Sequence, residues 1–395
     1  MNRWTSRTLD RRAIVGYAWE GGGSMRYLVV VIGLGLVLPC RAAAQSVPER
    51  TVANGGEDRP LAWRFVARAK LGMDQNGSSV FFRVFPWTVV ADGRGRVYVL
   101  DVGDNRVGIF DASGNHLRSV GALGGGPGEF LQPVGVAVDD ARTILVLDAA
   151  KGAIVRFDSA GGVQEQVRLE ARAVAIGVGE GGILIGQGPT PLQQLRLVRQ
   201  RDADVQTLAE VDQSTRQVRF SGCAMSVPER PLFAPDIVWA SAHGTTVLND
   251  TVAYRLVVLS KGTRTLIARD VPSVRVTRAE ALRSPGVRKG YTVRWPSGTC
   301  RVSPEELLDA RGFARQVSPV ERIVVVPGGG LWVQRRTTVA GNYRTDVFDA
   351  GGLYVGTLSA AIGFPSAFVS TDRFVVVESD HDGVPLVAFY DIERG

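Results

Sequence analysis

The sequence holds little of the chemistry by which enzymes are usually recognised. Its 395 residues include only three histidines and three cysteines, so a centre built from several imidazole or thiolate ligands is not expected. No Gly-x-Ser-x-Gly motif occurs, which leaves a hydrolase-type serine nucleophile unsupported. The glycine-rich run at 124–128 is not followed by Lys-Ser/Thr, and it therefore does not predict a phosphate-binding loop.

Lysine is scarce as well. Only Lys70, Lys151, Lys261 and Lys289 stand among the 46 basic residues, an arginine excess more typical of a GC-rich genome than of a phosphate-binding surface. The formal net charge of +7 falls to +3 for residues 45–395, because residues 1–44 hold six arginines and two acidic residues. The charge therefore predicts no nucleic-acid partner.

Near the N-terminus there is no apolar run long enough to span a membrane. The run at 27–38 has 12 residues, whereas a membrane-spanning helix needs about 20. It follows Met25-Arg26 and precedes Ala42 and Ala44, which match a small-residue cleavage site. We interpret residues 25–44 as a signal peptide cleaved near Ala44, and we expect a periplasmic or secreted protein without a membrane span.

Two features of the same region need separate interpretations. A lipoprotein anchor on Cys40 is the alternative to a cleaved peptide, but Pro39 stands where a small residue is expected. Residues 1–24 fit no targeting pattern. We therefore expect translation to start at Met25 and residues 1–24 to be a mis-assigned extension.

Cleavage would leave two cysteines, Cys223 and Cys300. In an oxidising compartment an even pair favours a disulfide. The alternative is two separate buried thiols.

The strongest pattern is a repeat with a period of 47 residues. Seven residues recur at this offset, and two valine pairs raise the total to nine identities over 29 ungapped positions. The recurring residues are Pro86, Asp92, Leu100, Asp101, Phe110, Asp111 and Gly114, matched by Pro133, Asp139, Leu147, Asp148, Phe157, Asp158 and Gly161. A period of this size, with short apolar runs between Gly and Asp turns, predicts propeller blades.

The repeat also resembles a known family. Its order is Pro, an apolar strand, Asp-Gly, Val-Tyr-Val-Leu-Asp, Asn-Arg-Val, Phe-Asp-x-x-Gly and a Gly-Gly-Gly-Pro-Gly-Glu-Phe connector. Over residues 83–170 this looks like NHL repeats, although the second copy has Lys151-Gly-Ala where the first has Asp-Asn-Arg. The chain as a whole resembles the exported bacterial six-bladed propellers of that superfamily.

We therefore expect an all-β chain, a six-bladed β-propeller over residues 61–395 that follows a polar leader at 45–60. The sixth blade shows only three strands of its own, so a strand at 61–71 should close it. Insertions at 212–231 and 271–319 break the rhythm, and they should lie on the rim. The second insertion predicts helices at 277–283 and 303–312.

Several polar residues are candidates for metal binding. Asp101 and Asp148 end apolar strands and could bind a cation such as calcium, but we favour carboxylates that accept backbone N–H groups in turns. His381 lies among acidic residues at 378–383, where a polar loop is favoured over a metal or acid/base site. His116 and His243 are expected in solvated turns. No cofactor is predicted.

The best candidate for a binding surface is one face of the propeller. Loops before the inner strands and between the second and third strands share that face. The candidate residues on it are Trp87, Asp104, Asn105, Arg106, Lys151, Glu378, Asp380 and His381.

These observations predict a monomeric, non-catalytic binding scaffold for a protein, peptide or glycan. The alternative is a metal-dependent lactonase or lyase that uses the channel mouth, of the kind that related propellers host. A structural protein of the cell envelope is a third interpretation.

Overall fold

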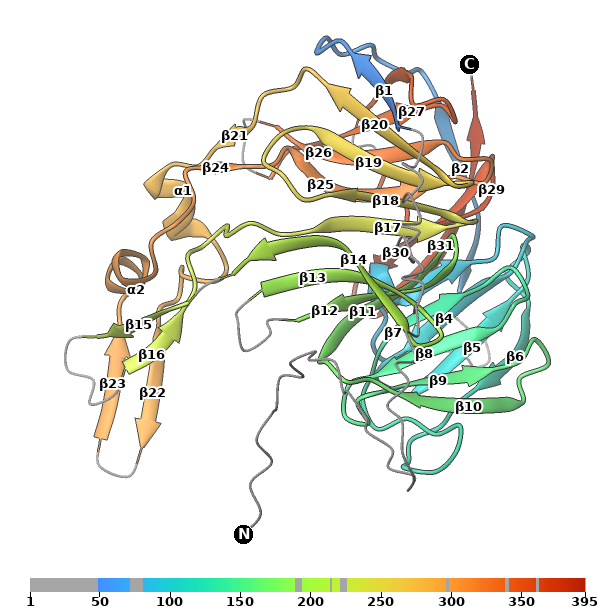
Figure 1. Ribbon diagram of the computed structural model, residues 1–395, viewed down its shortest axis with the longest axis horizontal. Coiled ribbons are helices and arrows are strands. Elements are labelled where there is room, and N and C mark those ends of the chain that lie inside the picture. Colours follow the sequence, from blue (N-terminus) through green and yellow to red (C-terminus); the bar gives the residue numbers. More distant parts are fainter. Residues whose placement is uncertain are drawn as a thin grey trace, which may run out of the picture. The chain divides into compact units, whose positions relative to one another are not determined.

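The computed structural model describes residues 49–71, 81–188, 194–213, 215–220, 226–295, 298–337, 341–359 and 362–394. The interpretations of residues 1–44 and of Cys223 lie outside these ranges. Within them, six sheets of four or five strands form the blades of a β-propeller (Figure 1). The predicted fold class is therefore confirmed.

Blades 1 to 3 are built from consecutive strands, which follow one another from the channel outward. Blade 1 consists of the 3-10 helix Pro86–Thr88 followed by β3 (Val89–Ala91), β4 (Val97–Asp101), β5 (Arg106–Phe110) and β6 (His116–Val120). Blade 2 consists of β7 (Pro133–Val138), β8 (Ile144–Asp148), β9 (Ala153–Phe157) and β10 (Val163–Arg168). Blade 3 consists of β11 (Ala173–Gly179), β12 (Gly182–Gln187), β13 (Gln194–Arg201) and β14 (Asp204–Asp212).

Blades 4 to 6 follow the same plan. Blade 4 consists of β17 (Val238–Ala242), β18 (Thr245–Asn249), β19 (Arg255–Ser260) and β20 (Thr263–Arg269). Blade 5 consists of β25 (Val320–Val325), β26 (Leu331–Arg336), β27 (Tyr343–Phe348) and β28 (Tyr354–Leu358). Blade 6 begins with β29 (Ala367–Ser370), β30 (Arg373–Ser379) and β31 (Pro385–Glu393).

Packing between blades explains the apolar runs in the sequence. Neighbouring blades cover both faces of each sheet. The inner strands therefore bury the side chains of both faces and are apolar along their length, instead of alternating between apolar and polar residues. All five residues of β4 and all five of β8 are buried. The core therefore lies in layers between adjacent sheets, and each innermost strand contacts the next around the ring.

The ring closes as the sequence predicts. Strand β2 (Arg64–Leu71) pairs antiparallel with β31, and it supplies the fourth strand of blade 6. Leu71 lies opposite Val387, and both are buried in the core between blades 6 and 1. Pairing of the first strand with the last sheet covers an edge that would otherwise be open.

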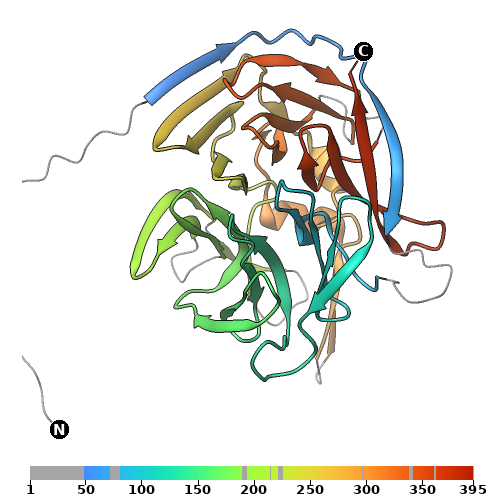
Figure 2. The ribbon, with the colours of Figure 1, turned by 90° about the vertical axis from the view of Figure 1, so that its right-hand side faces the viewer.

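The polar leader, by contrast, is not a free segment. Residues Glu49–Asn54 form β1, which adds a fifth strand in parallel to β20 of blade 4. Pro60 then bridges Thr357 in blade 5 before the chain reaches blade 6. We call residues 49–71 the N-terminal belt, which runs along the outside of the ring in Figure 2. The belt touches three blades, whereas the sequence predicted one.

A buried ion-pair network fixes the belt to blades 4 and 5. The guanidinium of Arg269, whose side chain is 0% exposed, lies 2.6 Å from Asp346 and 2.8 Å from Asp58 of the belt. Arg335 pairs with the same two carboxylates. Partial burial alone would raise the pKa of Asp58, but hydrogen bonds from Arg269 and Arg335 outweigh it and lower that pKa to about 2.

The two insertions fold together. They contain β15 (Arg216–Arg219), β16 (Ser226–Glu229), β21 (Val274–Arg275), α1 (Arg278–Arg283), β22 (Tyr291–Trp295), β23 (Gly298–Val302), α2 (Pro304–Arg311) and β24 (Gln316–Val317). Both predicted helices are present, and Thr277 and Glu280 form the capping box of α1. We call residues 212–231 and 271–319 the insertion module. No helix in the described ranges is long and apolar enough to cross a membrane.

The insertion module has a core of its own. Phe220 belongs to the first insertion, and Leu232 follows it directly. Both pack against Val302 and Leu307 of the second insertion. The ring of Phe220 meets Tyr291 edge-on, with centroids 5.4 Å apart. Cys300 is buried in this core. Its expected partner, Cys223, lies outside the described ranges, so their pairing stays a prediction.

Candidate functional site

The six innermost strands surround a channel of about 530 Å³. Its wall consists largely of valine, alanine and isoleucine, with Gly135 and Gly177 on neighbouring strands. A Cβ on Gly177 would collide with the hydroxyl of Ser241 and would lie 2.8 Å from the indole of Trp239, so only glycine fits there. Small residues on the inner strands therefore leave the centre of the ring open enough for a small ligand.

The strand directions define one face of the ring. Since successive strands of a blade run antiparallel, the connections between blades share a face with the turns between second and third strands. The insertion module interrupts two of those connections, β14 to β17 and β20 to β25. We call this the insertion face. Trp87 and the turns after β4, β8 and β30 lie on it, and these turns carry the other predicted surface residues.

Trp87 lies at the mouth of the channel on the insertion face. It is 65% exposed, and its indole stacks flat on Phe85 with ring centroids 4.6 Å apart and planes at 2°. One face of the indole is thus covered by Phe85. The rest of the ring is accessible as a platform for a ligand.

Arg322 lines the channel from β25, near the same mouth. Its guanidinium lies 4.8 Å from the centroid of the Phe364 ring. Among the described residues it makes no ion pair and no hydrogen bond, and burial lowers its pKa. A guanidinium that has lost water without gaining a counter-ion is costly, so this position favours an anion.

The nearest acidic residues are engaged elsewhere or lie at the rim. Glu321 forms an ion pair with Arg336 rather than with its neighbour Arg322. Asp236 lies at the same mouth, where its carboxylate accepts the backbone N–H of Ile237 at 2.8 Å. Neither carboxylate forms an ion pair with Arg322.

The opposite mouth is narrowed by His243. This residue follows β17 of blade 4 with a φ of +51°, and its ring reaches Gly93 of blade 1. A Cβ on Gly93 would come within 2.5 Å of the imidazole, so only glycine fits there. His243 is half-buried, and burial lowers its pKa despite Asp140 and Asp92 nearby. The predicted turn is present, but the ring is half-buried rather than solvated because it lies across the channel.

Asp101 and Asp148 have the structural role that we favoured. Asp101 is buried and accepts backbone N–H groups from Phe82 at 2.7 Å and Arg83 at 2.9 Å, as well as from two residues of its own turn. Asp148 repeats these four contacts in blade 2. Both carboxylates hold the connector that enters their blade.

Three predicted surface residues on blades 1 and 2 also have partners within their blades. Asp104 forms an ion pair with Arg106. The ammonium of Lys151 donates to the carbonyls of Gly126 at 3.0 Å and Glu129 at 2.8 Å, which fixes the glycine-rich connector. Asn105 occupies the left-handed position of its turn, with a φ of +54°.

The remaining predicted residues lie at the end of β30 and in the turn that follows it in blade 6. Glu378 pairs with Lys70 of the belt at 3.2 Å and accepts the hydroxyl of Tyr390. Asp380 accepts two backbone N–H groups of the turn. His381 is exposed, with Nε2 3.0 Å from the Asp382 carboxylate. The structure therefore does not bring the predicted residues together into one site; of that set, only Trp87 faces the channel.

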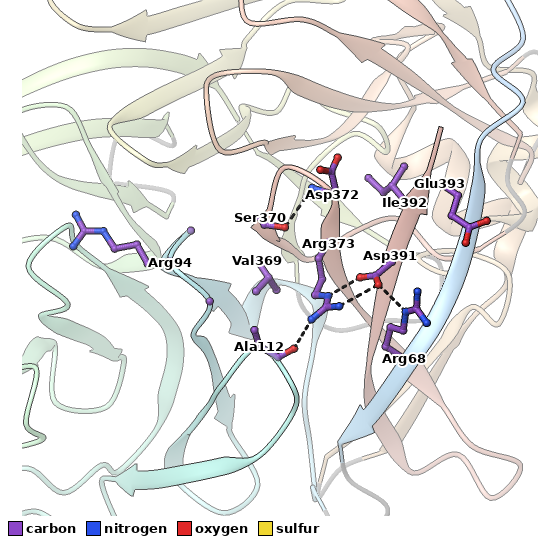
Figure 3. A pocket seen from close by; sticks show the side chains of 12 residues that line it. Arg68, Arg94, Ala112, Val369, Ser370, Asp372, Arg373, Asp391, Ile392 and Glu393 are labelled. Carbon is purple, nitrogen blue, oxygen red and sulfur yellow. Dashed lines mark hydrogen bonds and ion pairs between the residues drawn. The ribbon is translucent and has the colours of Figure 1, made fainter. Parts of the chain in front are cut away.

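A second hollow of about 490 Å³ lies where blade 6 meets blade 1 (Figure 3). Arg373 donates two hydrogen bonds to the Asp391 carboxylate, at 2.6 and 3.1 Å, and a third to the carbonyl of Ala112 at 3.0 Å. Arg68 of the belt lies 2.6 Å from the same carboxylate. Hydrogen bonds from Arg373 lower the pKa of Asp391. The charged groups at the centre of this hollow satisfy one another, and their contacts join the two ends of the ring.

Comparisons with known proteins agree with the fold. Residues 88–180 match a family model described as a 6-bladed beta-propeller, and no curated protein matches the sequence. A candidate exported protein from Bacteroides fragilis NCTC 9343 has a similar structure, with a TM-score of 0.51, 10% identity, and coverage of 87% of this chain and all of that one.

Two further solved structures are less similar. A duf4221 family member from Bacteroides vulgatus has a TM-score of 0.48 at 10% identity, with 84% of this chain and 99% of that chain covered. A catalytically inactive virginiamycin B lyase from Staphylococcus aureus has a TM-score of 0.39 at 12% identity, with 83% and 99% covered.

Sequence reasoning missed Arg322, although a signal was present. In blade 2 the inner strand begins Pro133-Val-Gly-Val, with small apolar residues. In blade 5 the corresponding stretch reads Pro319-Val-Glu-Arg-Ile. A charged pair at the start of an innermost strand is unusual because that strand borders the channel, and this could have directed attention to residue 322.

Proposed function

We propose that the protein is a non-catalytic binding scaffold that takes a carboxylate-bearing ligand into the channel from the insertion face. The observation that carries this proposal is the guanidinium of Arg322, which lines the channel without a counter-ion among the described residues. A ligand carboxylate supplies that counter-ion, and charge-assisted hydrogen bonds to arginine are among the stronger ones.

The rest of the mouth favours a ligand with a flat apolar part. Trp87 offers the accessible side of its indole at the same mouth, and stacking on such a ring adds affinity beyond burial. His243 narrows the far end, which favours entry of the ligand from the insertion face. A volume of about 530 Å³ suits a small molecule or the end of a peptide.

Three further proposals concern the export of the protein, the type of its blades and its disulfide. Residues 25–44 act as an export signal, which agrees with the name of the similar protein from Bacteroides fragilis. The blades belong to the NHL type, on the motifs of residues 83–170. Cys223 and Cys300 form a disulfide that joins the two halves of the insertion module, as expected for an exported protein.

The binding proposal is tested with N-acetylphenylalanine and its amide as probes, titrated into residues 45–395 and followed by tryptophan fluorescence. We expect the acid to bind at least tenfold more tightly than the amide, since a charge-assisted hydrogen bond contributes about 1.5–3 kcal/mol. Arg322→Gln should abolish that preference. The matched control is Arg94→Gln in a loop of the opposite face. Equal affinities for acid and amide in the native protein would contradict the proposal.

The catalytic alternative is tested separately. A metal-dependent lactonase or lyase needs convergent ligands, and in the described part of the chain the group with suitable geometry is Asp380, His381 and Asp382. That turn lies on blade 6 and does not line the channel. Metal analysis of the purified protein, with melting temperatures before and after chelation, distinguishes the two. A stoichiometric ion whose removal lowers the melting temperature would favour the enzyme.

A further inference from the structure

The charge of the chain is unevenly distributed. The insertion module holds twelve basic and six acidic residues, a net charge of +6. The remainder of residues 45–395 holds 28 basic and 31 acidic residues, a net charge of −3. The small net charge of the chain therefore conceals a basic module attached to a slightly acidic ring.

Many cations of the module are exposed and unpaired. Within the described ranges, eight basic side chains are exposed and have neither an ion pair nor a hydrogen bond: Arg219, Arg275, Arg283, Arg288, Lys289, Arg294, Arg301 and Arg315. Arg278 and Arg311, in contrast, pair with Asp309 and Glu229. The unpaired cations attract a partner of opposite charge.

Two of these cations lie on the outer face of the hairpin β22–β23. Cys300 and Val302 on one face of β23 are buried in the core of the module. Arg301 therefore points to the other face, and Arg294 of β22 is exposed on that face as well. Arg294 lies opposite Thr299, so Arg301 is its diagonal neighbour. Such neighbours are about 7–8 Å apart.

Neither edge of the hairpin has a further strand partner among the described residues. Strands β22 and β23 form a sheet of two strands, and within the described residues each pairs only with the other. Unpaired N–H and C=O groups along such an edge can accept another strand. In Figure 1 the hairpin extends beyond α2 at the lower left, beside β15 and β16.

We propose that the β22–β23 hairpin binds an extended acidic segment of a partner protein, which adds to the sheet as a third strand. Alternate side chains of an extended chain lie on one face about 6.7 Å apart. Arg294 and Arg301 are offset by two residues along the strands, so alternate Asp or Glu residues of the added strand lie level with each guanidinium in turn. Arginine also suits this role because its planar fork binds a carboxylate through two hydrogen bonds.

The test uses residues 45–395 and a fluorescein-labelled decapeptide of alternating Glu and Thr, titrated by anisotropy in 0.15 M NaCl. We expect Arg294→Glu with Arg301→Glu to weaken binding at least tenfold, and the neutral pair Arg294→Gln with Arg301→Gln to weaken it less. The matched control, Arg94→Glu with Arg255→Glu, reverses two exposed charges of the ring and should change affinity less than twofold. Arg322→Gln should have no effect, which separates this surface from the channel.

Strand addition has its own test. Two versions of the same decapeptide carry backbone N-methyl groups, one on the odd-numbered and the other on the even-numbered residues. Both keep the charge of the peptide, but only one of them loses the N–H groups that would pair with the edge of the hairpin. We expect that version to bind at least fivefold more weakly than the unmodified peptide. Equal binding of all three peptides, or no binding by the native protein, would overturn the proposal.

Other occupants give different results. Binding to anionic phosphatidylglycerol vesicles without peptide binding would overturn the proposal in favour of a membrane surface. Self-association at 0.05 M NaCl that the Arg294→Glu and Arg301→Glu variant loses, again without peptide binding, would overturn it in favour of the acidic ring of a second copy.

Discussion

Blades 1 to 3 and blades 4 to 6 are held together in different ways. The first three are made of consecutive strands, and in blades 1 and 2 a buried aspartate closes each unit through backbone hydrogen bonds. Blades 4 and 6 each borrow a strand from the N-terminal belt, and blade 5 is joined to the belt by ion pairs. One half of the ring is therefore locally stabilised, and the other depends on residues some 200 to 330 positions away along the chain.

This difference has a consequence for folding. Local hairpins can form as soon as their residues are available, whereas a strand from the opposite end of the chain must close a long loop. The second half should thus be the part that loosens first when long-range contacts are weakened. Substitutions in each half should reveal this difference, with effects that range from large to small.

The largest effect is expected for Arg269→Met in the second half. The substitution leaves Asp346 with a buried side chain and one fewer counter-ion, and breaking a buried pair costs about 3–5 kcal/mol. We expect the free energy of unfolding, measured in urea, to fall by that amount. The control is Arg264→Met, whose pairing with Glu49 of the belt is exposed and contributes about 1 kcal/mol or less. Equal losses would mean that the buried network does not fix the belt.

In the first half, Asp101→Ala should cost less. It removes a buried acceptor from several backbone N–H groups, and unsatisfied buried donors cost about 1–3 kcal/mol. We expect a loss of about 2–3 kcal/mol in the same measurement. Asp111→Ala removes similar contacts from an exposed turn and should cost less than about 1 kcal/mol. A loss as large as that of Arg269→Met would contradict the ranking of the two halves.

The belt also makes stability depend on acid. The pKa of Asp58 is about 2 in the folded protein, against 3.8 for an unperturbed group. This lowered pKa contributes about 2 kcal/mol, fully present above pH 3.8 and lost as the pH falls towards 2. Asp58→Asn should therefore be less stable than the native protein at pH 6, and the gap should narrow between pH 4 and 2. A constant gap would show that Asp58 has the same pKa folded and unfolded.

Local contacts could be predicted from the sequence, whereas most contacts between distant parts of the chain could not. Identities such as that of Asp101 and Asp148 revealed the blade repeat, because both carboxylates accept backbone N–H groups within their own blade. The closing strand was predictable because blade 6 visibly lacked one. Strand β1 was not, since its residues are polar and become a strand only when β20 lies beside them. Arg322 and His243 were missed for a related reason: their surroundings come from blades far away in the chain.

The smallest effect concerns the contact that joins the two halves across the channel. Burial between blade 4 and blade 1 lowers the pKa of His243 below 6.5, so the unfolded chain takes up a proton first as the pH falls. The free energy of unfolding is therefore independent of this group above pH 6.5, and it decreases as the pH falls below 6.5. Asn tolerates the left-handed backbone that His243 adopts, which makes His243→Asn a clean substitution. Between pH 7 and 5.5 the native protein should lose stability more steeply than His243→Asn. If both curves fall in parallel, the imidazole is solvated and the channel is open at both faces.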